Sequence, residues 1–250
     1  MEPVMLRVYQ GGNKGATAFF RNRPLLATLM DELAALGRPR VRVLVHAASI
    51  GAEPYSLALW HLHRIASRFD LEIHATDINA HFLAHAQKGE YPADLARGLT
   101  PEEMSWFERD GEVLRVPAAA KARVHFLPPM DCVRQRPEGL FDCVLIMNAL
   151  TYVTPAEQTA AIASAAQSGC ALLGLTAFHP DGIRADVEAA GFVPVMANHQ
   201  AIHDSWGDRL TDQPIDPAST EYSWKLPRYD AGTVDAPWRF GALFRPKGLG

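Results

Sequence analysis

Residues 41–58, VRVLVHAASIGAEPYSLA, decide how the rest of the chain is interpreted. Valine alternates with other residues from position 41 to 45, which predicts a buried strand. The chain must then turn over residues 48–51. Glu53 and Pro54 are typical of a first helical turn, where an acid faces the positive end of the helix dipole and proline sacrifices no hydrogen bond. Strand, small-residue turn and helix in this order predict the ligand-binding edge of a doubly wound α/β sheet.

A second strand is predicted at residues 71–79, LEIHATDIN, and it ends on Asp77. In doubly wound folds an acid at the tip of the second strand holds the ribose of a nucleotide-like cofactor. A carboxylate accepts both ribose hydroxyl hydrogens, which no neutral side chain does as well. We therefore expect Asp77 to bind the sugar of such a cofactor.

The motifs SIGAEPYSLA (residues 49–58) and ATDIN (residues 75–79) resemble the turn and second strand of the chemotaxis glutamate methyltransferases, the CheR family. Enzymes of this family bind S-adenosylmethionine (SAM) and release S-adenosylhomocysteine. The resemblance implies a class I SAM-methyltransferase fold: a Rossmann-like α/β domain with a seven-stranded, mostly parallel sheet and helices on both faces. It also implies cofactor contacts for Ser49, Gly51, Glu53, Asp77 and Ile78, with Glu53 near the methionine or ribose end.

A second signature of this family, T-x-F-F-R, matches residues 17–21, TAFFR. In CheR enzymes it lies just ahead of the catalytic domain. The resemblance places Thr17 against the cofactor and gives Arg21 both a cofactor contact and a catalytic position beside the methyl group. We expect residues 1–40 to form an N-terminal helical segment that covers the active site, and residues 41–250 to form the methyltransferase domain.

Residues 141–153, FDCVLIMNALTYV, are predicted to form a buried strand that runs into a loop. The corresponding CheR pattern is F-D-x-I-x-x-R-N-x-x-x-Y-F. The match implies that Asn148 and Ala149 contact the cofactor and that Tyr152 is a second catalytic residue beside the methyl. Asp131, in LPPMD, is expected to accept a hydrogen bond from the adenine amino group.

Three positions depart from the family pattern. Met147 replaces the family arginine, Ala47 lies near a family glycine, and residues 176–180, TAFHP, stand where the family has G-H-S-E. An alanine at position 47 crowds the backbone approach to the cofactor. These departures leave open a non-catalytic SAM-binding module.

The acceptor is expected to be a small molecule. Only 16 residues precede the TAFFR motif, which leaves no room for the family's receptor-gripping helical domain, and no counterpart of its small β-subdomain is evident. The alternative is a protein carboxyl (glutamate) O-methyltransferase. A carboxylate acceptor is ionised at pH 7 and needs only a cation such as Arg21 to align it. An amine or hydroxyl acceptor would need a base, for which Tyr152, His179 and His203 are candidates.

The remaining elements are predicted from periodicity and capping signals. A capping box is expected at Thr100. A segment at about 203–237, rich in Asp, Pro and aromatic residues, is expected to be a lid-like insertion. Further helices are predicted at residues 25–36, 80–88, 155–168 and 181–190, and further strands at 170–178, 192–201 and 238–246.

Composition excludes several classes of function. The 250 residues are 48% hydrophobic and 21% charged, and the net charge of −4 gives no electrostatic case for binding nucleic acid or an anionic membrane. Three widely spaced cysteines argue against a disulfide framework and favour the cytoplasm. His81 and His85 share a helical face but lack a third ligand, so no metal is expected. A glycine-poor first turn argues against a nicotinamide oxidoreductase. The oligomeric state stays open.

Overall fold

A computed structural model describes residues 6–10, 13–93, 98–135, 138–176, 180–207, 238 and 241–248. Its main sheet has seven strands in the order β11-β12-β10-β9-β3-β4-β8. The strands are β3 (Arg40–His46), β4 (Asp70–Ala75), β8 (Val124–Phe126), β9 (Cys143–Met147), β10 (Leu172–Thr176), β11 (Phe192–Pro194) and β12 (Leu243–Pro246). β12 is antiparallel to both neighbours and the other pairings are parallel. The predicted seven-stranded, mostly parallel sheet is confirmed.

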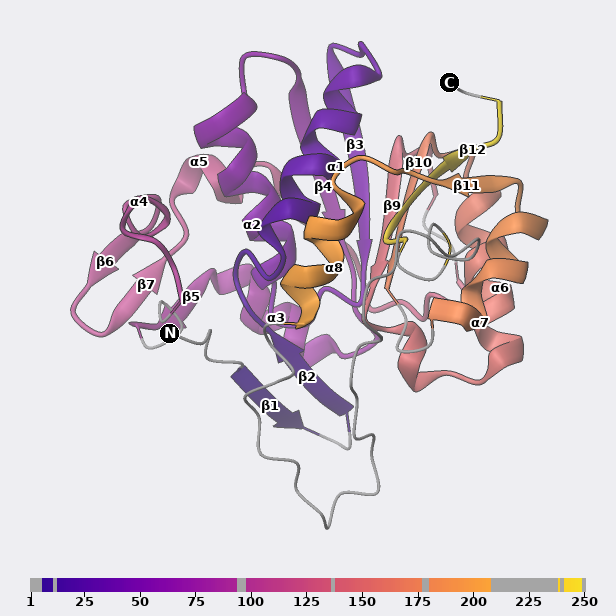
Figure 1. Ribbon diagram of the computed structural model, residues 1–250. Coiled ribbons are helices and arrows are strands. Elements are labelled where there is room, and N and C mark those ends of the chain that lie inside the picture. Colours follow the sequence, from indigo (N-terminus) through magenta and orange to yellow (C-terminus); the bar gives the residue numbers. More distant parts are fainter. Residues whose placement is uncertain are drawn as a thin grey trace.

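Helices cover both faces of this sheet (Figure 1). One side carries α1 (Arg23–Ala35), α2 (Ala52–Trp60), α3 (Ala80–Lys88) and α8 (His199–Gly207), and the other carries α6 (Pro155–Ala166) and α7 (Pro180–Ala189). Alternation along β3 separates two cores, because Val43 and Val45 belong to the cluster with α1 and α2, whereas Leu44 belongs to the cluster with α6 and α7. The Rossmann-like class predicted from the sequence is therefore the observed one.

Two small antiparallel sheets were not predicted. A hairpin of β1 (Leu6–Gln10) and β2 (Asn13–Thr17) precedes α1, and a three-stranded sheet joins β5 (Glu90–Pro92), β7 (Val113–Arg115) and β6 (Glu108–Asp110). The three-stranded sheet projects beside the main body (Figure 1). The sequence analysis had found no counterpart of the family's small β-subdomain near the carboxyl end, and the three-stranded sheet lies in the middle of the chain. Strands of three residues are too short to give a period-two signal in the sequence.

Helix starts were predicted better than strand ends. The capping box at Thr100 is present and begins α4 (Pro101–Met104), and a second one at Thr154 begins α6. The strand predicted at 192–201 is wrong beyond Pro194, because the chain turns through Asn198, with φ of 54°, into α8. The short elements α5 (Ala118–Lys121), the π-helix His61–Ile65 and the 3-10 helix Leu150–Tyr152 complete the fold.

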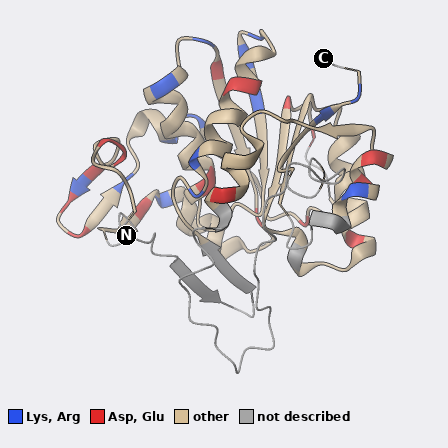
Figure 2. Ribbon diagram, in the orientation of Figure 1, with Lys and Arg blue, Asp and Glu red and all other residues tan. Residues whose placement is uncertain are grey.

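Charge is distributed without segregation by sign over the described residues. Figure 2 shows Lys and Arg interspersed with Asp and Glu on both sides of the sheet. Among these residues no helix combines the length and the apolarity needed to cross a bilayer. Within the same ranges no group of three His, Cys, Asp or Glu side chains is arranged to hold a metal ion. His179 and positions 208–237 of the predicted lid lie outside the described residues.

Candidate active site

The turn between β3 and α2 adopts an alternating left-handed backbone. Ala47, Ser49 and Gly51 have φ of 54°, 51° and 90°. Only glycine occupies this region without a steric cost. At Gly51 packing also demands glycine, because a Cβ there would lie 2.8 Å from the Cβ of Ala86 and 3.1 Å from the hydroxyl of Tyr91. The turn therefore has the backbone of a glycine-rich loop although two of its three left-handed positions carry side chains.

Asp77 joins this turn to the loop that follows β4. One oxygen of its buried carboxylate accepts the Ser49 N–H at 2.8 Å and the other accepts the Asn79 N–H at 2.9 Å. Burial raises the pKa of Asp77, and the backbone N–H bonds oppose that shift. The Ile78 N–H is a third backbone donor to this carboxylate, whose two oxygens together accept about four hydrogen bonds and so keep capacity for another donor. The next residue, Ile78, is 61% exposed, which is a large value for an isoleucine beside a buried acid.

Arg21 and Glu53 are half-buried and form an oppositely charged pair, with Glu53 in the first turn of α2. Burial lowers the pKa of Arg21, whereas the charges of Glu53 and Tyr152 raise it. Burial raises the pKa of Glu53 to about 7 against the opposing effect of Arg21. The segment that carries Arg21 is fixed to α2 because the Phe20 N–H donates to Ser56 Oγ at 2.9 Å. Phe20 itself is strained, with φ of 48°.

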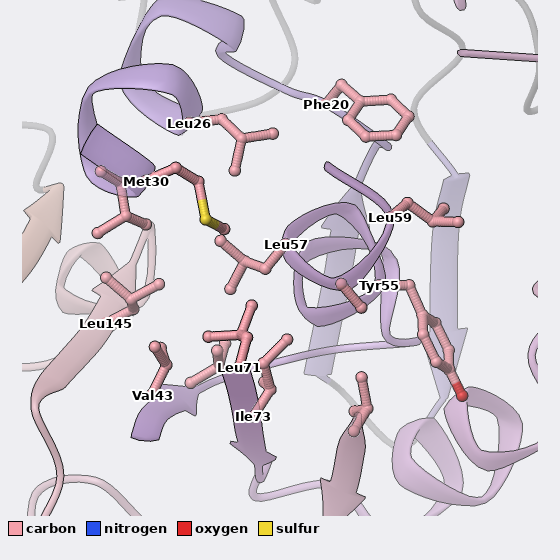
Figure 3. Packing of buried hydrophobic residues seen from close by; sticks show 14 of the residues in the cluster. Phe20, Leu26, Met30, Val43, Tyr55, Leu57, Leu59, Leu71, Ile73 and Leu145 are labelled. Atoms are coloured by element: carbon pink, nitrogen blue, oxygen red, sulfur yellow. The ribbon is translucent and has the colours of Figure 1, made fainter. Parts of the chain in front are cut away.

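A cavity of about 60 Å³ opens beside this pair. It lies between α1, α2, the carboxyl end of β9 and β12, and Figure 3 shows Leu26, Leu57 and Leu145 pointing toward one another in this region. Of the residues predicted for the site, four line the cavity: Thr17, Arg21, Glu53 and Asn148. The rest of the lining is Ala18, Phe20, Asn22, Leu25, Leu26, Leu29, Ser56, Leu57, Leu145, Met147 and Leu243.

Buried polar atoms without a hydrogen-bond partner gather at this edge of the sheet. Among the described residues they include Ser49 Oγ, Glu53 Oε1 and Asn148 Nδ2. Asn148 is also left-handed, with φ of 56°, and its N–H donates to Thr176 Oγ1 at 2.7 Å. A buried polar group without a partner costs about 1–3 kcal/mol. Such a cluster fits a ligand that offers donors and acceptors to all three side chains.

The other predicted residues lie outside the cavity lining. Tyr152 is 65% exposed in the 3-10 helix after β9. Asp131 is half-buried, and its carboxylate accepts the Val133 N–H at 2.9 Å. Ala149 is half-buried and follows Asn148 directly. The structure thus brings Thr17, Arg21, Glu53 and Asn148 together and leaves the remaining predicted residues on adjoining loops.

Two residues at the site were missed in the sequence analysis. His46 ends β3 and is 5% exposed with Nδ1 unpartnered, and burial lowers its pKa to about 4 although Asp131 opposes this, so the ring is neutral. A polar residue that closes an apolar strand was the available signal. Asn22 caps α1 by accepting the Leu25 N–H at 3.0 Å and donates to the Ile202 carbonyl of α8 at 2.8 Å. No local pattern predicts that second contact.

Comparison with known families agrees with this geometry. Residues 15–172, more than half of the chain, match the family described as CheR methyltransferase, SAM binding domain. The chain belongs to the CheR methyltransferase family. The match includes the TAFFR segment, the left-handed turn, Asp77 and Asn148, which are the parts that build the site. This CheR domain therefore has S-adenosylmethionine as its cofactor and the class I methyltransferase fold.

Relatives of this CheR chain share its central part. A chemotaxis protein methyltransferase of Listeria innocua is 31% identical over 143 residues, covering 55% of this chain and 54% of the relative. Chemotaxis protein methyltransferase 2 of Pseudomonas aeruginosa is 40% identical over 114 residues, covering 43% and 39%. The chain thus spans about half the length of the curated relatives it matches. Magnesium protoporphyrin IX methyltransferase from Synechocystis, solved with bound S-adenosylhomocysteine, overlaps 68% of this chain and 73% of its own at 17% identity and a TM-score of 0.43.

Proposed function

We propose that this chain is a SAM-dependent methyltransferase that acts on a small-molecule acceptor. The observation that carries the proposal is the coincidence of unpartnered buried atoms on Ser49, Glu53 and Asn148 with an apolar cavity beside Arg21. Polar atoms of this kind fit the hydroxyl, amino and carboxylate groups of the cofactor. The cavity adjoins them, and its leucine lining suits a compact molecule rather than an extended, solvated chain.

The proposed cofactor contacts follow the edge of the sheet. Asp77 holds the ribose hydroxyls with the lone pairs that its backbone contacts leave open, and Ser49 and Gly51 bring the turn close to the ligand. The exposed face of Ile78 covers the adenine. The other proposed contacts are Asp131 and Ala149 at the adenine and Thr17, Arg21, Glu53 and Asn148 at the methionine end.

The bound cofactor supplies a methyl group on a sulfonium, and the chain supplies positioning. Holding two reactants in near-contact accounts for about 7–11 kcal/mol of a barrier. Arg21 is half-buried in the lining of the cavity and aligns the acceptor, and Tyr152, in the 3-10 helix after β9, is the second catalytic residue. In this proposal the N-terminal segment, residues 1–40, covers the active site.

Two other functions have specific support. The relatives are named chemotaxis protein methyltransferases, which favours a protein carboxyl group as the acceptor. Met147 and Ala47, where the family has arginine and glycine, favour a module that binds SAM without turnover. The alternatives differ in which molecules receive the methyl group from SAM, so one experiment with a labelled methyl group separates them.

The test combines calorimetry with transfer of a labelled methyl group. Titration with SAM and with S-adenosylhomocysteine should show binding, and Asp77→Ala should weaken both by about tenfold or more, the loss of a charge-assisted hydrogen bond. Incubation with methyl-tritiated SAM and a bacterial extract should then label the small-molecule fraction. Label only in the protein fraction would establish the protein carboxyl alternative. Binding without any label would establish the non-catalytic one, and absence of binding would refute all three.

A further inference from the structure

An ion pair links the start of α1 to α4, 80 residues later in the chain. Arg23, the first residue of α1, donates from Nε and Nη2 to the two carboxylate oxygens of Glu103, each at 2.6 Å. Nη2 also donates to the carbonyl of Gly98 at 2.7 Å. Such a fork of two parallel N–H bonds fixes the orientation of both partners as well as their distance.

The carboxylate of this pair lies almost wholly out of water, because Glu103 is 3% exposed. Burial acts to raise the pKa of Glu103, but hydrogen bonds from Arg23 and Thr100 outweigh it and lower that pKa, so the group is ionised at pH 7. An ion pair with a buried partner adds little net stability, because the attraction is offset by the loss of hydration. The distinctive contribution of this pair is therefore its geometry.

The segment before α1 lies between α2 and the residues that follow α4. On one side the Phe20 N–H donates to Ser56 Oγ of α2. On the other side the ring of Phe19 meets that of Phe107 edge-on with centroids 4.9 Å apart, and the ring of Phe20 meets that of Trp106 at 5.4 Å. The position of this segment therefore depends on two parts of the chain that are far apart in sequence.

The backbone of Phe20 makes the segment dependent on these contacts. Its φ of 48° lies in the left-handed region, which carries a steric cost for an aromatic residue. Such a conformation persists only where the surroundings over-determine it. Arg21 follows directly and, like Thr17, lines the cavity at the proposed methionine end of the cofactor. Relaxation at Phe20 would move Arg21 relative to Thr17.

We propose that Glu103 is a positioning residue for the cofactor site. Through its fork with Arg23 it holds the chain on the carboxyl side of Phe20, so that Thr17 and Arg21 already face the cofactor before it binds. This inference rests on the proposed function and adds a residue that lies outside the cavity lining. Glu103 contacts neither the cofactor nor the acceptor and acts only through Arg23.

Two neighbouring glutamates of α4 provide a matched test. Glu103→Gln removes the charge and replaces one acceptor oxygen of the fork by a donor, but glutamine still supports the capping box at Thr100. Glu102→Gln makes the same change in an exposed ion pair with Arg64, also at 2.6 Å, in the π-helix after α2. Each variant loses one ion pair from the same helix, and only Glu103→Gln loses the contact with α1.

Hydrogen exchange of the ligand-free proteins, followed by NMR, measures the position of the segment without reference to the cofactor. The Phe20 amide should exchange at least about tenfold faster in Glu103→Gln than in the wild type, because a hydrogen bond to a charged group that opposes opening is lost. Its exchange in Glu102→Gln should equal that of the wild type. Equal exchange in all the proteins, or equal acceleration in both variants, would overturn the proposal.

Calorimetry with S-adenosylhomocysteine measures the consequence for the site. Glu103→Gln should weaken binding by about tenfold, because the apparent dissociation constant rises as the correctly placed fraction of the protein falls. Arg23→Gln should give a similar loss and the double variant no larger one, because both changes remove the same interaction.

Lower stability of Glu103→Gln in urea with unchanged affinity for S-adenosylhomocysteine would show that the ion pair is only structural, and would refute the positioning role. Absence of binding to the wild-type protein would instead refute the proposed function. The two failures are therefore distinguishable on the same set of proteins.

Discussion

Two neighbouring alanines in the turn after β3 should respond oppositely to the same substitution. Ala47 has φ of 54°, in the left-handed region, and is half-buried. Ala48 is 2% exposed, and of the two only Ala47 has a positive φ. Ala47→Gly should therefore stabilise the protein, and Ala48→Gly should destabilise it.

The magnitudes follow from three contributions. A left-handed conformation costs an L-residue about 1–2 kcal/mol. Glycine recovers that energy but gives the unfolded chain extra freedom worth about 0.4–1 kcal/mol. The net gain for Ala47→Gly is about 0.5–1 kcal/mol. Ala48→Gly has only the entropic loss and a buried methyl worth about 0.8 kcal/mol, so it should cost about 1–2 kcal/mol.

Urea unfolding of the ligand-free proteins measures both values. The midpoints should move in opposite directions while the slopes stay equal, because the exposed surface is the same. Thermal unfolding should show Ala47→Gly higher by about 2 °C, the shift expected for a chain of this size. If Ala47→Gly were as destabilising as Ala48→Gly, the left-handed strain would be refuted.

Three further substitutions probe the site. Without ligand, the wild-type protein should lose about 3 kcal/mol of stability between pH 4.5 and about pH 7, because the Glu53 carboxyl has a raised pKa, stabilises the fold below its ordinary pKa and loses that contribution as it ionises. Glu53→Gln cannot ionise, so this pH dependence should be absent from the variant. Unfolding of both proteins at both pH values measures the difference. Ser49→Ala should leave stability unchanged or higher but weaken SAM binding, since Ser49 Oγ has no partner in the described structure. Unchanged affinity in calorimetry, or a clear loss of stability in urea unfolding, would contradict it. Asn22→Asp keeps the cap of α1 but removes the donor to Ile202, so hydrogen exchange should rise in α8 and not in α1.

The sequence predicted those parts of the fold that are encoded locally. The valine alternation of β3, the turn and the acid at the end of β4 gave the Rossmann-like class and the position of the site. The capping boxes gave the starts of α4 and α6. The order of the sheet beyond β9, with β12 reversed between β10 and β11, depends on pairings between distant strands. Periodicity describes one element at a time and does not specify such pairings.

The same division holds within the site. The resemblance to CheR indicated Arg21 and Glu53 separately, but their pairing in the lining of one cavity is a property of the packed chain. The contact of Asn22 with Ile202 joins residues 180 positions apart, so the local sequence around either residue does not predict it. The left-handed backbone at Ala47 was hidden for a different reason. Alanine rarely adopts this conformation, so comparison with the family pattern showed only that a glycine is absent at position 47 and did not indicate a left-handed backbone there.

Strain and unsatisfied polarity coincide at one edge of this sheet. Ala47, Ser49 and Asn148 are left-handed, and Ser49 and Asn148 also carry unpartnered buried atoms. Each feature costs about 1–3 kcal/mol, so together they consume a large part of the stability of a typical domain. A ligand present at 100 times its dissociation constant adds about 2.7 kcal/mol. Saturating SAM should therefore offset much of this cost and raise the thermal midpoint by several degrees. In Ser49→Ala the rise in thermal midpoint on adding SAM should be smaller, because that variant lacks one of the atoms with which the ligand forms a hydrogen bond.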